Sequence, residues 1–129
     1  MNISVLIPNE NWVCDKIGND FKVNSSHTVS FNDPTCDLFW LLSPWLWNLV
    51  PKKFLENNFV VCTVHHIVPE KFNVNDFLSR DKYVDAYHVP CEQTKNNIKK
   101  YTTKPIHVLG YWVDQDIWYA EDRGQAKKD

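Results

Sequence analysis

Two adjacent histidines, His65 and His66, follow an apolar run in the stretch "VCTVHHIVPEKF" at residues 61–72. Imidazoles in such a place can bind a metal, transfer a proton, or donate and accept hydrogen bonds. A zinc site needs further ligands, and the chain has no H-x-x-H, H-E-x-x-H or C-x-x-C spacing to supply them. We therefore expect no metal here and interpret the pair as one polar contact at a cleft with one structural neighbour, or as two structural residues.

Phosphate-binding loops are not evident in the sequence. The three glycines stand at positions 18, 110 and 124, so the chain contains neither G-x-G-x-x-G nor a P-loop. Such loops need glycine where the backbone approaches phosphate closely, and the turn after the first apolar run is instead "PNENW". The sequence therefore disfavours classical dinucleotide binding and P-loop chemistry.

The elements that must position these side chains alternate along the chain. Short apolar, β-rich runs predict strands at 3–8, 27–31, 36–44, 59–66, 85–90 and 105–113. Between them, helical spacing predicts helices at 9–26, 45–58, 75–84 and 92–101, the first weakened by Gly18 and the second kinked or begun at Pro51. This alternation predicts an α/β protein with a Rossmann-like, doubly wound parallel sheet in three α/β/α layers, forming a single domain over residues 1–113.

Ligands of open parallel sheets bind beyond the carboxyl ends of the strands, so the residues there are the candidates for function. On the predicted strands the substrate-binding candidates are Asn9, Glu10, Asn11, Trp12, Trp45, Glu92 and Trp112, with His65 and His66 as the catalytic candidates. Aromatic faces can stack on sugar rings while Asn, Glu and His supply directed hydrogen bonds. Because neighbouring side chains of an extended segment point to opposite faces, we expect at most one histidine to face the cleft, and we favour His65.

Length, charge and cysteine usage narrow the class of protein. A chain of 129 residues with a formal net charge of -2 fits one domain without a basic surface, so we expect no nucleic-acid partner. The four cysteines form no C-x-x-C pair and no secretory signal precedes them, which favours a reduced, cytoplasmic protein. Trp45 and Trp47 beside Lys52 and Lys53 could form a peripheral membrane contact, although burial against the sheet explains the same residues.

Two segments carry a resemblance to a known family. "VVCTVHHIVPEKF" at 60–72 and "DAYHVPCEQTKNNIKKYTTKPIHVLGYWVDQDIWY" at 85–119 resemble the N-terminal half of GT-B-fold glycosyltransferases of the retaining, glycogen- and lipopolysaccharide-synthase-like group. His65 or His66 matches the family's histidine at the cleft, and Cys91-Glu92 matches a Ser-Glu-like pair that opens a helix. The sequence departs from the family's pattern at "PNENW", at Cys91 and at Tyr111-Trp112.

The resemblance implies the acceptor-side half of an enzyme that transfers a sugar from a nucleotide-sugar donor to a sugar, lipid or polysaccharide acceptor. Residues 114–129 would then be the interdomain linker and the start of a C-terminal domain, which would bind the donor. On this interpretation residues 1–129 bind no cofactor themselves and are inactive alone.

Two alternatives stay open at this point. The chain could be a stand-alone Rossmann-like binding or interaction module without catalytic activity, with its Trp-rich face as the interface. It could also be a small metal hydrolase that uses the two histidines, an interpretation that requires stoichiometric zinc in the purified chain.

Overall fold

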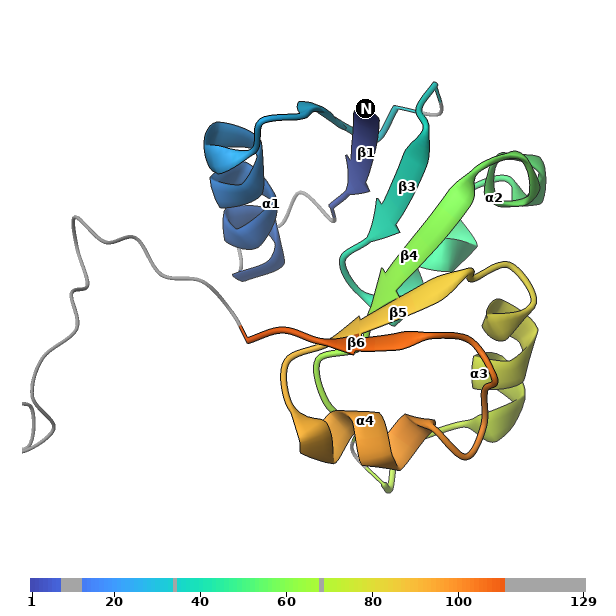
Figure 1. Cartoon of the computed structure of the whole chain (residues 1–129). Coiled ribbons are helices and arrows are strands. Elements are labelled where there is room, and N and C mark those ends of the chain that lie inside the picture. Colours follow the sequence, from blue (N-terminus) through green and yellow to red (C-terminus); the bar gives the residue numbers. More distant parts are fainter. Residues whose placement is uncertain (8–12, 34, 68, 111–129) are drawn as a thin grey trace, which may run out of the picture.

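The computed structural model of the protein describes residues 1–7, 13–33, 35–67 and 69–110, and it is built on a six-stranded sheet (Figure 1). All neighbouring strands pair in parallel, in the spatial order β2-β1-β3-β4-β5-β6. The strands are β1 (Asn2–Leu6), β2 (Thr28–Phe31), β3 (Leu38–Leu41), β4 (Phe59–Thr63), β5 (Ala86–Val89) and β6 (Ile106–Val108). The predicted parallel α/β sheet is therefore confirmed, with each described strand at its predicted place and usually shorter.

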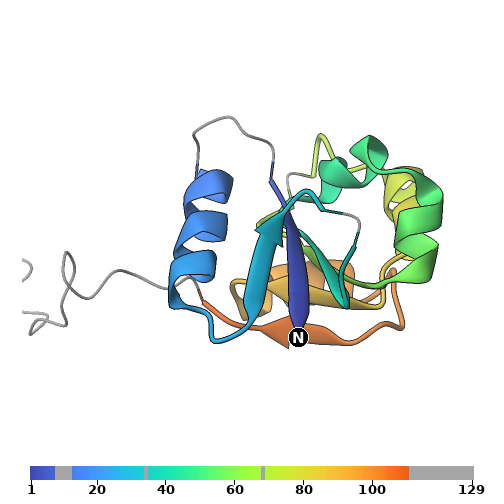
Figure 2. The ribbon, with the colours of Figure 1, turned by 90° about the horizontal axis from the view of Figure 1, so that it is seen from above.

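Helices cover both faces of the sheet because the chain reverses its direction of winding between β1 and β3. Helix α1 (Val13–Asn24) lies on one face, and α2 (Lys52–Asn57) and α3 (Val74–Asp81) lie on the other (Figure 2). Helix α4 (Glu92–Ile98) shares the face of α3, since Tyr101 just after it packs on Phe77 with ring centroids 5.9 Å apart. The result is the predicted three-layer, doubly wound, Rossmann-like arrangement.

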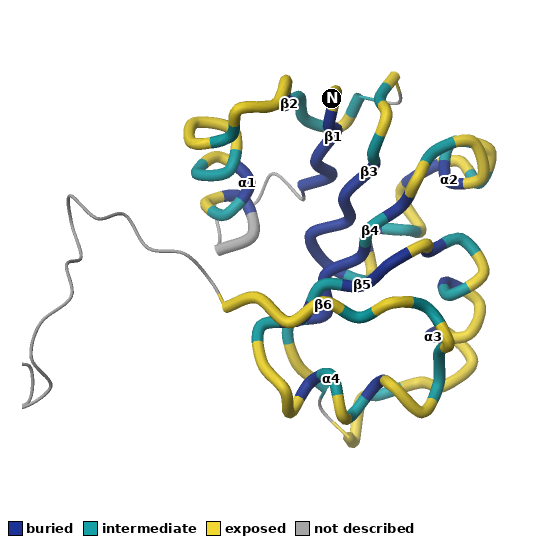
Figure 3. Tube along the Cα trace, viewed as in Figure 1, coloured by how far each residue is buried: buried dark blue, intermediate teal, exposed yellow. Residues whose placement is uncertain are grey.

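The two faces of the central strands carry different side chains. Trp40 of β3 meets Phe21 of α1 edge-to-face, with ring centroids 5.0 Å apart. On the opposite face Tyr87 of β5 stacks on Phe77 of α3, with centroids 5.6 Å apart. Consecutive residues are buried at Phe39–Leu41 of β3 and at the end of β4, so both faces are covered there, as the dark blue parts of these strands indicate (Figure 3). This burial explains the apolar runs of the sequence.

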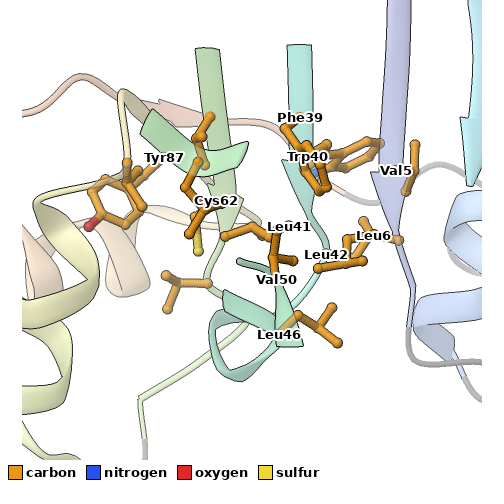
Figure 4. Packing of buried hydrophobic residues seen from close by; sticks show 14 of the residues in the cluster. Val5, Leu6, Phe39, Trp40, Leu41, Leu42, Leu46, Val50, Cys62 and Tyr87 are labelled. Atoms are coloured by element: carbon orange, nitrogen blue, oxygen red, sulfur yellow. The ribbon is translucent and has the colours of Figure 1, made fainter. Parts of the chain in front are cut away.

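The hydrophobic core contains apolar side chains from these strands and from the segment that follows β3. The labelled side chains of Figure 4 come from β1, β3, β4 and β5 and from residues 42–50. Leu41, Leu42 and Leu46 are among those fully removed from solvent. Burial of apolar surface on this scale, at about 25 cal/mol per Å², is the main favourable contribution to folding.

The tryptophan-rich segment confirms the predicted helix start at Pro51 but not the prediction of a single helix over 45–58. It forms a 3-10 helix, η1 (Pro44–Leu49), and then the separate helix α2, with Pro51 at the N-cap of α2. A proline cannot donate a backbone hydrogen bond within a continuing helix, which explains the break. Trp47 is covered by Lys52, whose Nζ lies 3.7 Å from the centroid of the indole ring, whereas Trp45 is 48% exposed.

Within the described ranges, no helix combines the length and the apolar composition needed to cross a bilayer. The predicted C-terminal linker at 114–129 lies outside those ranges, as does the end of the predicted sixth strand.

Gly18 lies inside helix α1, at a point where the helix packs closely on the residues after β1 and β3. A Cβ atom at this position would lie 2.9 Å from Ile7 Cγ2 and 3.3 Å from Leu42 Cδ1. Glycine costs about 1 kcal/mol of helix propensity relative to alanine, but it allows α1 to approach the ends of β1 and β3.

We expect Gly18→Val to lower the free energy of unfolding by about 2 kcal/mol, because the added methyl groups overpack this contact. Urea unfolding followed by circular dichroism measures the change. Asn19→Val places the same β-branched side chain on the exposed side of α1 and should cost well under half as much. Equal losses in the two variants would show that the contact with Ile7 and Leu42 does not require glycine at this position.

Candidate functional site

The carboxyl ends of β3, β4 and β5 bring the histidine pair and the start of α4 to one edge of the sheet, here called the carboxyl edge. His65 Nε2 lies 2.6 Å from the carbonyl oxygen of Leu42, the residue after β3. The Thr94 hydroxyl of α4 in turn donates to the carbonyl oxygen of His65 at 3.4 Å. His65 therefore ties the end of β4 to the end of β3 and to α4.

The bond to the Leu42 carbonyl shows which nitrogen of His65 carries a proton. A carbonyl oxygen only accepts hydrogen bonds, so Nε2 must carry a proton. The ring is half-buried and its orientation is set by the backbone of β3.

His66 points elsewhere and lines an open groove of about 320 Å³, here called the His66 groove. Its walls come from η1, from the segment after β4 and from α3. They include Trp45, Trp47, His66, Lys71, Asn73 and Arg80. Of the two histidines, His66 is the exposed one, so a ligand in this groove meets His66.

The other candidate residues are partly described. Trp45 shares the His66 groove, and Glu92 lies exposed in the first turn of α4. The remaining substrate-binding candidates, Asn9, Glu10, Asn11, Trp12 and Trp112, lie outside the described residues. The structure thus brings Trp45 and His66 together and connects His65 to the helix that carries Glu92.

A chain of hydrogen bonds that begins at the buried Trp40 crosses the strands beside this edge, and the sequence did not predict it. Trp40 Nε1–H donates to Thr63 Oγ1 at 2.8 Å, and Thr63 Oγ1 lies 3.0 Å from His88 Nδ1. His88 Nε2 is 2.8 Å from the carbonyl oxygen of Leu109. Because the carbonyl requires a proton on Nε2, and Thr63 already accepts from Trp40, the simplest assignment has the Thr63 hydroxyl donating to a neutral His88.

The pKa values support a neutral His88. Burial lowers the pKa of this imidazole, and the Leu109 carbonyl opposes that effect without cancelling it. The nearby His65 and His107 lower the pKa further. A hydroxyl donated to Nδ1 stabilises the neutral ring, so the hydrogen bonds and the electrostatics agree.

Cys91 opens α4 with an exposed thiol. Its Sγ lies 3.4 Å from Thr94 Oγ1, and hydrogen bonding from Thr94 lowers the pKa of the thiol. The Thr94 hydroxyl donates its one hydrogen to the His65 carbonyl, so the Cys91 thiol is the donor to Thr94 Oγ1. This side chain links the matched pair Cys91-Glu92 to the histidine pair.

Metal binding was not expected, and within the described ranges no three His, Cys, Asp or Glu side chains cluster in a way that could hold a metal ion.

Comparisons with models of protein families, with curated proteins and with solved structures give no significant match. The His66 groove itself offers hydrogen bonding by His66 and Asn73, charge from Lys71, Arg80 and Asp76, and stacking on Trp45.

We expect Thr63→Val to lower the free energy of unfolding by about 1–3 kcal/mol, because it removes the acceptor of the buried Trp40 N–H. The same substitution in a Trp40→Phe background should cost clearly less, since no indole donor is then left without Thr63. Denaturant unfolding of the four proteins gives the coupling energy. A coupling near zero would show that the two side chains do not depend on each other.

Acidification should destabilise the protein through His88. Its pKa in the folded protein lies below the value of about 6.5 for an unfolded chain, so the unfolded chain binds the proton first as the pH falls. The free energy of unfolding is therefore expected to decrease below about pH 6.5 and to level off below the folded pKa. Urea unfolding at a series of pH values measures this.

His88→Gln is the control, since its amide can donate to the Leu109 carbonyl but does not titrate. Its stability should fall less between about pH 7.5 and 5.5 than that of the unsubstituted protein. Parallel pH profiles would exclude His88 as the cause.

Proposed function

We propose that this chain is the N-terminal, acceptor-side half of a glycosyltransferase that uses a nucleotide-sugar donor. One observation carries the proposal. The two pairs that match the family, His65-His66 and Cys91-Glu92, meet at the carboxyl edge, joined by the Thr94 hydroxyl bond to His65. In open parallel sheets this edge is where ligands bind.

The roles follow from the geometry of the edge. His66 is the exposed member of the pair and would contact the acceptor or the transferred sugar, while His65 holds β3, β4 and α4 in place. Trp45 offers an exposed aromatic face for a sugar ring. Glu92, in the first turn of α4, would shape the floor beside His65.

The donor would bind to a second, Rossmann-like domain encoded after residue 129. The leaving nucleoside diphosphate needs electrostatic stabilisation, which we assign to that second domain. On this proposal residues 1–129 have no transferase activity alone, and the complete enzyme works in the cytoplasm.

The first test is to read the gene beyond codon 129, where we expect roughly another 150–200 residues, about one more domain. The intact product is then incubated with a panel of nucleotide sugars and acceptors, and released nucleoside diphosphate is measured. If no second domain is encoded, or no donor is turned over, the proposal fails in favour of a stand-alone interaction module.

In the active enzyme, His66→Ala should lower kcat/KM about 10- to 100-fold, which is the effect of losing a hydrogen bond made to the substrate in the transition state. His27→Ala is the matched control, because His27 is exposed and lies just before β2, at the opposite edge of the sheet. Unchanged activity in the double variant with His65→Ala and His66→Ala would disprove this site assignment.

A further inference from the structure

Arg80 is a buried cation with no counter-ion in the part of the chain that the structure describes. It lies in the last turn of α3 and is 7% exposed. Its guanidinium lies over the Phe77 ring, with Cζ 5.0 Å from the centroid, and its Nε is buried without a hydrogen-bond partner. Between described residues the ion pair is Lys16–Asp20, so no carboxylate pairs with Arg80 there.

Two weakly acidic side chains lie near Arg80, the Cys62 thiol and the Tyr87 phenol, but neither supplies a negative charge. Burial raises the pKa of the Cys62 thiol to about 11, even though Arg80 lowers it. Burial and the bond to Asp81 likewise raise the pKa of the Tyr87 phenol. Both groups are neutral at pH 7, whereas arginine remains protonated in proteins. A buried charge of this kind is costly unless something pairs with it.

Arg80 also lines the His66 groove, and that is where a counter-ion can reach it. Lys71 adds a second cation to the walls, and Asn73 and His66 add neutral hydrogen-bonding groups. Asp76 is the acidic residue of the lining, and its negative charge offsets the positive charge of Lys71. Trp45 contributes an exposed ring beside these polar groups.

We propose that the His66 groove binds a ring-containing ligand through an oxyanion, a phosphate or a carboxylate, that pairs with the guanidinium of Arg80. The planar guanidinium presents donors in a fork that fits two oxygens of either group. The ring of the ligand lies against Trp45. The inference does not rest on the proposed glycosyl transfer, because it follows from the charge of Arg80, which no carboxylate among the described residues pairs with.

Titration of the ¹⁵N-labelled chain followed by NMR tests the proposal, with phenyl phosphate, benzoate, inorganic phosphate and benzyl alcohol as probes. We expect saturable binding of phenyl phosphate or benzoate that shifts the Nε–H signal of Arg80 and the indole signal of Trp45. Comparison of these two probes identifies the oxyanion. Benzyl alcohol, which is neutral, should bind at least tenfold more weakly, and inorganic phosphate should shift Arg80 without Trp45.

The proposal is overturned if neither aromatic anion saturates, or if benzyl alcohol binds as well as they do. Arg80→Met keeps the length and the apolar stem of the side chain and removes its charge. It should weaken binding of the preferred anion at least tenfold while keeping the circular dichroism spectrum and the melting temperature, because it leaves no described ionic partner unpaired.

Lys99→Met is the matched control, since Lys99 is exposed at the end of α4 and outside the groove lining. It should bind the anion as the unsubstituted chain does. Undiminished binding by a folded Arg80→Met protein would refute the assignment. If that variant does not fold, the response of the Arg80 Nε–H signal in the unsubstituted chain decides the question.

Discussion

The parallel register of β3, β4 and β5 is the constraint on which the site depends. Trp40 pairs with Val61 and Thr63 pairs with His88, so the indole, the hydroxyl and the imidazole come to the same face of the sheet. Their hydrogen bonds are short and directional, and a shift of one residue in any strand would move a polar side chain to the opposite face. The same register brings the end of β4 beside the end of β3, where His65 reaches the carbonyl of Leu42.

Polar groups around α3 and β5 are otherwise well satisfied, which makes Arg80 an exception. Asp81, next to it in the helix, accepts hydrogen bonds from the Tyr87 hydroxyl at 2.6 Å and from the Thr102 hydroxyl at 2.7 Å. Lys104 Nζ donates to the backbone carbonyl of Asp81 at 2.8 Å. Folded proteins pair nearly all buried polar atoms, so the Nε of Arg80, which has no partner among the described residues, stands out beside this network.

The sequence was enough to predict the strands and helices, but not the contacts between them. Apolar runs and punctuating prolines predicted the parallel sheet, because strands buried on both faces and helix breaks leave a local signature. Gly18 weakened the prediction of α1 because glycine is a poor helix former. The close approach to Ile7 that requires glycine is a tertiary contact, which the sequence does not show. The bond between Trp40 and Thr63 depends on register, which no single segment encodes.

The spacing of Arg80 in the sequence already places it on the buried side of α3. It follows Phe77 by three residues in a helix, so the two share a face, and Phe77 is the apolar residue that most clearly marks the buried side. What the spacing could not reveal is that Arg80 forms no ion pair with Asp76, four residues before it, or with any other described carboxylate.

A fold of this kind serves many functions, so the placement of the groove matters more than the architecture. Winding reverses between β1 and β3, the usual place for a ligand in a doubly wound sheet, yet the Leu42 carbonyl beside that reversal already accepts a hydrogen bond from His65. The His66 groove instead lies one strand further on, next to β4, with η1 as one wall. Because η1 is anchored by the buried Leu46, this wall rests on the core and holds Trp45 beside the groove, while Arg80 is placed by α3, whose Phe77 is buried in the same core.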